Sequence, residues 1–203
     1  MRSMRSHLAN RAAGWIATVP LLVVTLSTVS CSRDHPLPRG PEDLAPTPPV
    51  GSVPFPNRLN PGNDGTSYEP CSVSANEVIS LGWSPTSKRD AATVDKQTAR
   101  GCIWHDAQLG SVWSVSQIVG NSPSLDAYRT SHPHFTWLPD VTINGRTIGV
   151  HLMGPSTCAT SVQSQRAGVS TIVSYNRVPA PPTSQICDRA IAFTRATISQ
   201  MPI

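Results

Sequence analysis

Alternating apolar and polar positions in the middle of the chain predict two β-hairpins. Residues 101–106 and 111–119 alternate on either side of a glycine-containing turn, as paired antiparallel strands do. Residues 141–143 and 146–153 flank Asn144-Gly145, whose two residues tolerate the positive φ angles of a tight hairpin turn. The pattern therefore predicts four strands joined in pairs.

Two further strands and three helices complete the predicted domain. Residues 158–163 and 168–175 alternate like strands, and a helix over 186–199 follows a proline-rich break. Shorter helices are predicted at 74–81, after a capping box, and at 123–130, after a Ser-Pro start.

The stretch from 83 to 98 is polar and charged, and is predicted to be a loop. These elements predict an α+β domain in which an antiparallel sheet of about five to six strands has its helices packed on one face. The other face of such a sheet must be polar or occupied.

The first 30 residues read as an export signal rather than as part of the fold. Arg2, Arg5 and Arg11 form a basic start, and the apolar run that begins at Trp15 is short for a permanent transmembrane helix. The sequence Thr-Val-Ser before Cys31 resembles a bacterial lipobox, although Thr stands where Leu is usual. We expect a lipoprotein signal peptide at 1–30, with Cys31 acylated and anchored to the cell membrane outside the cytoplasm; an ordinary secretory signal is the alternative.

Residues 31–66 have the composition of a tether. Nine prolines interrupt any helix or strand there, so the segment is expected to be disordered and to hold residues 67–203 away from the membrane. Binding of this segment to a proline-recognition module is the alternative interpretation.

Removal of residues 1–30 lowers the net positive charge of the chain. The whole chain carries a formal net charge of +4, but without the three arginines of the signal it retains 13 basic and 12 acidic residues. Most of the basic excess therefore belongs to targeting, and no nucleic-acid partner is expected.

Four cysteines lie in the predicted domain, at positions that do not match a structural zinc site. They are Cys71, Cys102, Cys158 and Cys187. An exported domain favours disulfides, and four cysteines allow three pairings. We favour Cys71 with Cys102 and Cys158 with Cys187, because each pair staples one end of the domain to a neighbouring segment, and we assign them a structural role.

Candidate chemistry is sparse. His132 and His134 could contribute to a metal site with His105 or His151, but exposed or hydrogen-bonded histidines are the simpler interpretation, and neither a metal nor another cofactor is expected. The sequence contains no GxSxG or HExxH motif and no glycine-rich phosphate loop.

Three tryptophans that stand among polar residues are the candidate binding residues. Trp83, Trp113 and Trp137 could line an apolar groove for an acyl chain, a glycan or a partner protein. Packing of the same side chains in the core is the alternative, and the commoner fate of tryptophan.

The lipobox, the proline-rich tether, Glu69-Pro-Cys-Ser, Gly101-Cys-Ile-Trp and the late Cys187 together resemble the actinobacterial, notably mycobacterial, envelope lipoproteins of the Lpr/Lpp type. The resemblance covers nearly all of the mature chain and supplies no catalytic residues. The resemblance says little about chemistry. Taken with the sparse candidate chemistry and the three tryptophans, the sequence predicts a noncatalytic, lipid-anchored protein that binds a partner protein or an apolar envelope ligand. The alternatives are a cell-wall glycan or lipid hydrolase or transferase, and a sensory or assembly accessory of a membrane complex.

Overall fold

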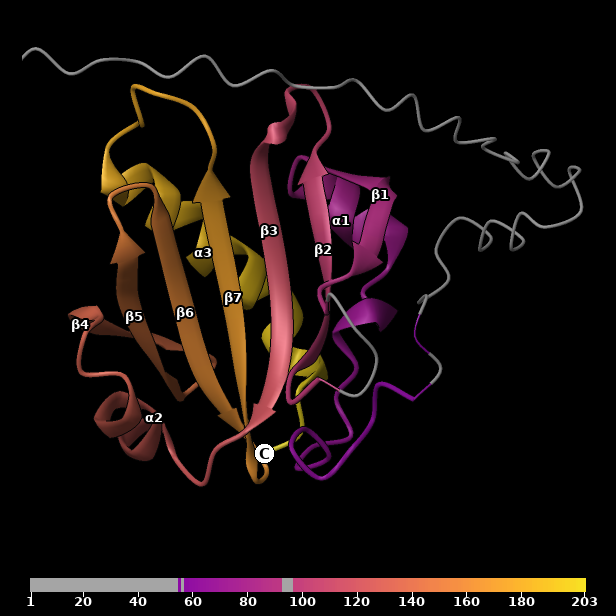
Figure 1. Ribbon diagram of the computed structural model, residues 1–203, viewed down its shortest axis with the longest axis vertical. Helices are drawn as coiled ribbons and strands as arrows, with labels where there is room; N and C mark the ends of the chain where they lie inside the picture. Colours follow the sequence, from indigo (N-terminus) through magenta and orange to yellow (C-terminus); the bar gives the residue numbers. More distant parts are fainter. Residues whose placement is uncertain (1–54, 56, 93–96) are drawn as a thin grey trace, which may run out of the picture. The chain divides into compact units, whose positions relative to one another are not determined.

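Seven antiparallel strands form one sheet with the order β1-β2-β3-β7-β6-β5-β4 (Figure 1). The computed structural model describes Phe55, residues 57–92 and residues 97–203. The strands are β1 (Trp83–Asp90), β2 (Arg100–Asp106), β3 (Gly110–Asn121), β4 (Thr136–Ile143), β5 (Arg146–Gly154), β6 (Thr157–Ser164) and β7 (Ala167–Tyr175). The helical elements are η2 (Pro70–Ser72), α1 (Ala75–Ser80), α2 (Leu125–Ser131), α3 (Thr183–Thr197) and η3 (Ile198–Gln200). The predicted signal peptide, Cys31 and most of the predicted tether lie outside the described residues.

The strand count is seven rather than the predicted five to six, because residues 83–90 form a strand and not a loop. β1 is an edge strand: Trp83 pairs with Asp106 and Asp90 with Cys102, with a register shift in between. An edge strand tolerates proline and charge, since only one side needs a partner. The polar composition that suggested a loop is therefore compatible with this strand.

The predicted hairpin turn between β4 and β5 is confirmed. Asn144 and Gly145 adopt φ angles of 50° and 75°, and Ile143 pairs with Arg146. The local sequence decides this turn, because few residue pairs accept positive φ at both positions.

Helices lie on both faces of the sheet, not on one as predicted. Ile148 and Val150 of β5 belong to the buried clusters on which α3 and η3 pack, and this side of the sheet is called the α3 face. The intervening Gly149 and His151 point the other way, where Leu125 of α2 and the Trp137 ring lie against Gly149. This opposite side is called the α2 face; Figure 1 shows α2 near the ends of β5 and β6 and α3 behind β6 and β7.

Two disulfides brace the structure, and both follow the favoured pairing. Cys71 is bonded to Cys102 and ties η2 to β2, while Cys158 is bonded to Cys187 and ties β6 to α3. The paired cysteines are separated by 31 and 29 positions in the sequence, and each bond stabilises the fold by about 3 to 4 kcal/mol in the chain-entropy model.

The packed part of the chain begins before the predicted boundary between residues 66 and 67. Asn63 and Thr66 are buried, and their carbonyl oxygens accept hydrogen bonds from the buried Arg100 side chain. Arg100 also forms an ion pair with Glu69 at 2.9 Å. The last residues of the predicted tether are therefore part of the domain.

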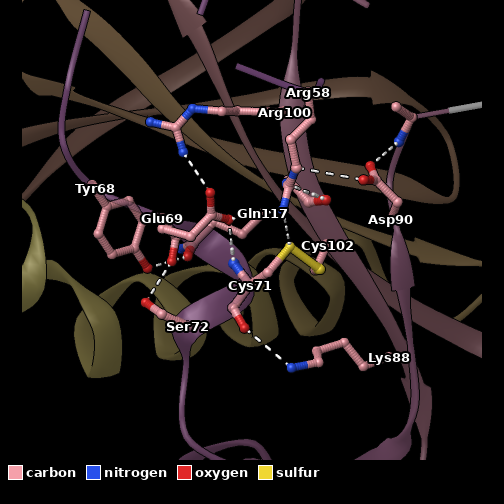
Figure 2. Close-up of a disulfide and its surroundings, with 12 residues drawn as sticks. Arg58, Tyr68, Glu69, Cys71, Ser72, Lys88, Asp90, Arg100, Cys102 and Gln117 are labelled. Carbon is pink, nitrogen blue, oxygen red and sulfur yellow. Dashed lines mark hydrogen bonds and ion pairs between the residues drawn. A yellow bond between two sulfur atoms is a disulfide. The ribbon is translucent and has the colours of Figure 1, made fainter. Parts of the chain in front are cut away.

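Arg58 joins this segment to the first disulfide, as Figure 2 shows. Its guanidinium donates to Cys71 Sγ at 3.1 Å and to the Gly101 carbonyl at 3.1 Å, and it forms an ion pair with Glu69. The contacts link the entry of the chain to η2 and β2. Arg58 therefore has a structural role in positioning the start of the domain.

Candidate functional site

Two of the three candidate tryptophans are core residues. Trp83 is 1% exposed and Trp113 is 4% exposed, and both belong to the cluster of the α3 face. The Arg189 guanidinium lies over both rings, 5.3 Å from the centre of Trp83 and 4.2 Å from that of Trp113. The core alternative therefore holds for these two side chains, and neither offers an exposed aromatic surface.

Arg189 is held in place by Asp106. The two side chains form an ion pair at 3.0 Å, and Asp106 also accepts hydrogen bonds from the backbone N–H groups of Gln108 and Leu109. Burial alone would raise the pKa of Asp106, but these hydrogen bonds and the arginine charge outweigh it and lower the pKa. This carboxylate is a structural anion and not a proton donor.

Trp137 lies apart from the other two, on the α2 face. Its ring is half-buried in a cluster of aromatic and imidazole rings from α2, β4 and β5 and the loop after α2. Arg129 stacks on it at 5.0 Å, and the indole N–H donates to the His132 carbonyl. The three tryptophans do not form a groove, because Trp83 and Trp113 are buried on the α3 face and Trp137 lies on the opposite face.

His151 is the buried centre of this ring cluster. It is 0% exposed, and its ring stacks on Phe135 at 4.8 Å and lies 4.4 Å from Trp137. Neither ring nitrogen has a hydrogen-bond partner. Burial, with smaller effects from the charges of His132 and Arg129, lowers the pKa of His151 to about 4, so the ring is neutral at pH 7.

The histidines do not converge on a metal site. The His132 and His134 rings are 6.0 Å apart, and Phe135 stacks on both His132 and His151. His105 lies on another strand and contacts Arg89. Within residues 57–92 and 97–203, no group of three or more His, Cys, Asp or Glu side chains is placed to hold a metal ion.

A cavity of about 470 Å³ lies between α2 and the sheet on the α2 face. One wall comes from α2 and the residues beside it, and the opposite wall from Gly62, Thr98 and Ala99. The floor is formed by neighbouring strands β3 and β7. The floor residues are Ile118, Gly120, Gly168 and Ser170, and the α2 wall includes Ser122, Pro123, Ala127, Tyr128, Ser131 and His132.

Two glycines opposite one another open the floor of this cavity. Gly120 of β3 pairs with Gly168 of β7. A Cβ atom on Gly120 would have no neighbour within 4 Å, and one on Gly168 would make only ordinary contacts, the nearest at 3.7 Å. Neither residue has a positive φ, so neither the backbone nor the packing of the described residues requires glycine here.

Other glycines of the sheet contrast with this pair. A Cβ on Gly101 would lie 2.0 Å from the Gln117 carbonyl oxygen, and one on Gly149 would lie 2.9 Å from Leu125 and Trp137. Those positions have a structural reason for glycine. Glycine within a strand marks a bulge, a bend, or a close approach by a ligand or another backbone. The β5–β6 register shifts next to Gly154, whereas the β3–β7 register runs through Gly120 and Gly168 without a shift, which leaves close approach as the explanation for this pair.

The sequence interpretation missed the two floor glycines. The sequence did contain a signal for them: each is an isolated glycine at the end of a stretch with strand-like alternation, a pattern that indicates a bulge or a close approach of another group to the backbone. Their pairing depends on β7 lying beside β3, although β4, β5 and β6 separate the two strands in sequence. The sequence predicts His132 as a candidate metal ligand, but the structure places it on the cavity wall.

A family model described as "Protein of unknown function (DUF3558)" matches residues 26–200, so the chain belongs to that family. No curated protein and no solved structure matches the chain. Among the described residues, no helix is long and apolar enough to cross a membrane. The family description names no activity, ligand or site residue.

Proposed function

We propose that this member of the DUF3558 family is an exported lipoprotein whose domain binds an envelope ligand without transforming it. The basic and apolar start, followed by Cys31, supports export and lipid anchoring to the cell membrane, as in the actinobacterial Lpr/Lpp-type lipoproteins that the sequence resembles. Two disulfides are in keeping with an oxidising compartment outside the cytoplasm.

The ligand site of the proposal is the cavity between α2 and the sheet. The observation that carries it is the Gly120–Gly168 floor, where two paired strand residues give up side chains that the fold has room for. Each glycine in a strand lowers stability by roughly 0.5 to 1 kcal/mol relative to alanine. A ligand that needs the open floor is a physical reason to retain both.

The lining favours binding over catalysis. Acid–base catalysis on a glycan or lipid needs groups that donate and accept protons, commonly a pair of carboxylates. The described residues that line the cavity include one imidazole, that of His132, and no carboxylate, lysine or cysteine. The chemistry of the lining therefore supports a carrier or receptor more than a hydrolase or transferase.

The binding proposal is tested by filling the cavity. The full chain and its Gly120→Leu variant are purified from the native envelope, and the small molecules retained by each are identified by mass spectrometry. We expect a ligand on the unmodified protein that the variant lacks. Gly154→Leu is the matched control, because a Cβ there also meets no neighbour within 4 Å and Gly154 lies outside the cavity.

The outcomes separate the three classes of function. A retained ligand lost only from Gly120→Leu supports the binding role, and a ligand recovered in a chemically altered form supports an enzyme. A co-purified membrane protein that is unaffected by Gly120→Leu supports the accessory role. The same retained molecules on all three proteins would contradict the cavity as the binding site.

Lipid anchoring is tested separately with Cys31→Ser. The unmodified protein is expected in the membrane fraction and in the detergent phase of a phase separation, because a thioether-linked lipid anchors it. The Cys31→Ser variant is expected in the aqueous phase. Equal membrane association of the two proteins would contradict acylation of Cys31.

A further inference from the structure

We infer that the cavity between α2 and the sheet binds a neutral sugar ring. This inference rests on the proposed binding function and adds the chemical class of the ligand. It follows from three properties of the cavity: the absence of a formally charged side chain on its described lining, the direction of the hydrogen bonds that Ser122, Ser131 and His132 already make, and the aliphatic groups of its floor and α2 wall.

The described lining carries no formally charged side chain. It contains hydroxyl, amide and small apolar groups together with the His132 ring. Arg129 of α2 is engaged elsewhere, with Trp137 and with the carboxylates of Asp126 and Asp140. An ionised ligand would lose water on entering this cavity without meeting an opposite charge, which is costly. The lining therefore selects an uncharged ligand.

The serine hydroxyls on the α2 side have already used their hydrogens. Ser122 donates to the Ser124 carbonyl at 3.0 Å, and Ser131 donates to the Tyr128 carbonyl at 2.9 Å. A hydroxyl group has one hydrogen and two lone pairs. Ser131 Oγ also lies 3.0 Å from His132 Nδ1, which engages one of its lone pairs, so each serine oxygen retains at least one lone pair that can accept. The two serines therefore favour a ligand that donates hydrogen bonds.

His132 has the same polarity. Its Nδ1 lies 2.9 Å from the Tyr128 carbonyl oxygen, and because a carbonyl can only accept, the hydrogen is on Nδ1. In that tautomer the lone pair is on Nε2, which can accept a hydrogen bond. Two hydroxyl oxygens and one ring nitrogen on one wall thus form a set of hydrogen-bond acceptors.

Aliphatic groups line part of the floor and part of the α2 wall. Ile118, Pro123 and Ala127 contribute aliphatic carbon, and the glycine pair lets a flat ring approach the backbone of β3 and β7. A neutral sugar combines hydroxyl donors at its edge with aliphatic C–H groups on its faces. An acyl chain would leave the three acceptors without donors, and a cationic donor would lack a counter-charge.

The test compares probes of different chemistry on the full chain in detergent. Saturation-transfer NMR is recorded with a neutral hexose disaccharide, with glucuronic acid, with glucosamine and with decanol as a neutral acyl probe. We expect transfer to the disaccharide, strongest at its ring C–H protons, and little or none to the other three. Stronger transfer to a charged sugar or to decanol would overturn the inference.

Variants locate the binding. Gly120→Leu is expected to weaken disaccharide binding at least tenfold, because its side chain occupies the floor, whereas Gly154→Leu is expected to bind normally. The Ser122→Ala, Ser131→Ala double variant removes two acceptors and is expected to weaken binding about tenfold. Near-UV circular dichroism verifies that each variant is folded.

Failure of this inference is distinguishable from failure of the proposed function. Binding of decanol or another nonsugar probe that Gly120→Leu abolishes would overturn the sugar assignment and leave the cavity as a binding site. Disaccharide binding that is unchanged in both Gly120→Leu and the double serine variant would place the sugar elsewhere. No probe binding, combined with the same native ligands on Gly120→Leu and the unmodified protein, would overturn both.

Discussion

The two faces of the sheet differ in packing, although the same strands form both: the α3 face is packed and the α2 face is partly open. On the α3 face, valines alternate with hydroxyl groups and pack against α3. On the α2 face, the same strands present serine, glycine and half-buried isoleucine, and only one end is covered by α2 and its ring cluster. The α3 face is built for stability, whereas the α2 face retains an open cavity.

Polar groups are treated differently on the two faces. Under α3, Gln117 accepts a hydrogen bond from Tyr68 at 2.5 Å and donates to Thr171 and Thr197, each at 2.9 Å. The buried side chains complete one another's hydrogen bonds, and burial raises the pKa of Tyr68. On the α2 face, Ser122 and Ser131 line the cavity, and each retains a lone pair that can accept a hydrogen bond. Satisfied polar groups stabilise a fold, and spare acceptors provide a site for a ligand.

The largest expected effect comes from truncating the α3 face. Phe193 is 0% exposed and packs against Trp104 in a tilted arrangement, with ring centres 5.5 Å apart. Phe193→Ala is expected to lower the free energy of unfolding by about 3 to 5 kcal/mol, because it leaves a cavity in a packed core. Ile172→Ala on the half-exposed α2 face is expected to cost less than about 2 kcal/mol. Equal losses in denaturant unfolding would contradict the comparison.

Removal of the second disulfide is the next largest change. The Cys158→Ala, Cys187→Ala double variant is expected to lower the free energy of unfolding by about 3 to 4 kcal/mol. Because this bond ties α3 to β6, amide hydrogen exchange is expected to accelerate in α3 more than in α2. An equal acceleration in both helices would show that the two faces open together.

Acid tests the buried imidazole of the α2 face. The pKa of His151 is about 4 in the fold, below the usual value of 6.5, so between these values the unfolded chain binds the additional proton. Stability is therefore expected to rise with pH through this window, and His151 alone accounts for about 2 kcal/mol between pH 5 and pH 7.5. Urea unfolding at both pH values, with His151→Phe as the comparison, isolates this effect. A pH dependence that is the same in both proteins would contradict it.

The smallest expected effect on stability comes from replacing a strand glycine with alanine, and its sign differs between a position with room for a Cβ atom and one without. Gly120→Ala is expected to stabilise the fold by about 0.4 to 1 kcal/mol. The added Cβ meets no neighbour in the folded state, and alanine lowers the conformational entropy of the unfolded chain. Gly101→Ala is expected to destabilise it by more than about 1 kcal/mol, because its Cβ would collide with the Gln117 carbonyl. Thermal unfolding of both variants checks the signs. Destabilisation by Gly120→Ala would mean that the fold, and not a ligand, requires this glycine.

Local signals predicted much of the fold. The Asn144-Gly145 turn, six of the seven strands and the C-terminal helix depend on short-range preference and alternation, which the sequence displays directly. The β1 strand was missed, because an edge strand with proline and charge differs little from a loop until its partner is known. The sequence also did not decide whether Trp83 and Trp113 are buried or exposed, because their burial depends on which distant segments pack against them.

The candidate site was the least predictable part. No local property of Gly120 or Gly168 indicates that they face one another, and Ser122, Ser131 and His132 become a set only when α2 lies against the sheet. The sequence alone determined the turn residues and the alternation of the strands, because these depend on a few neighbouring positions. It also determined that four cysteines are present in the domain. Tertiary structure alone decided which strands became neighbours, which face received α3 and where a cavity remained, because those outcomes depend on contacts between segments that are distant along the chain.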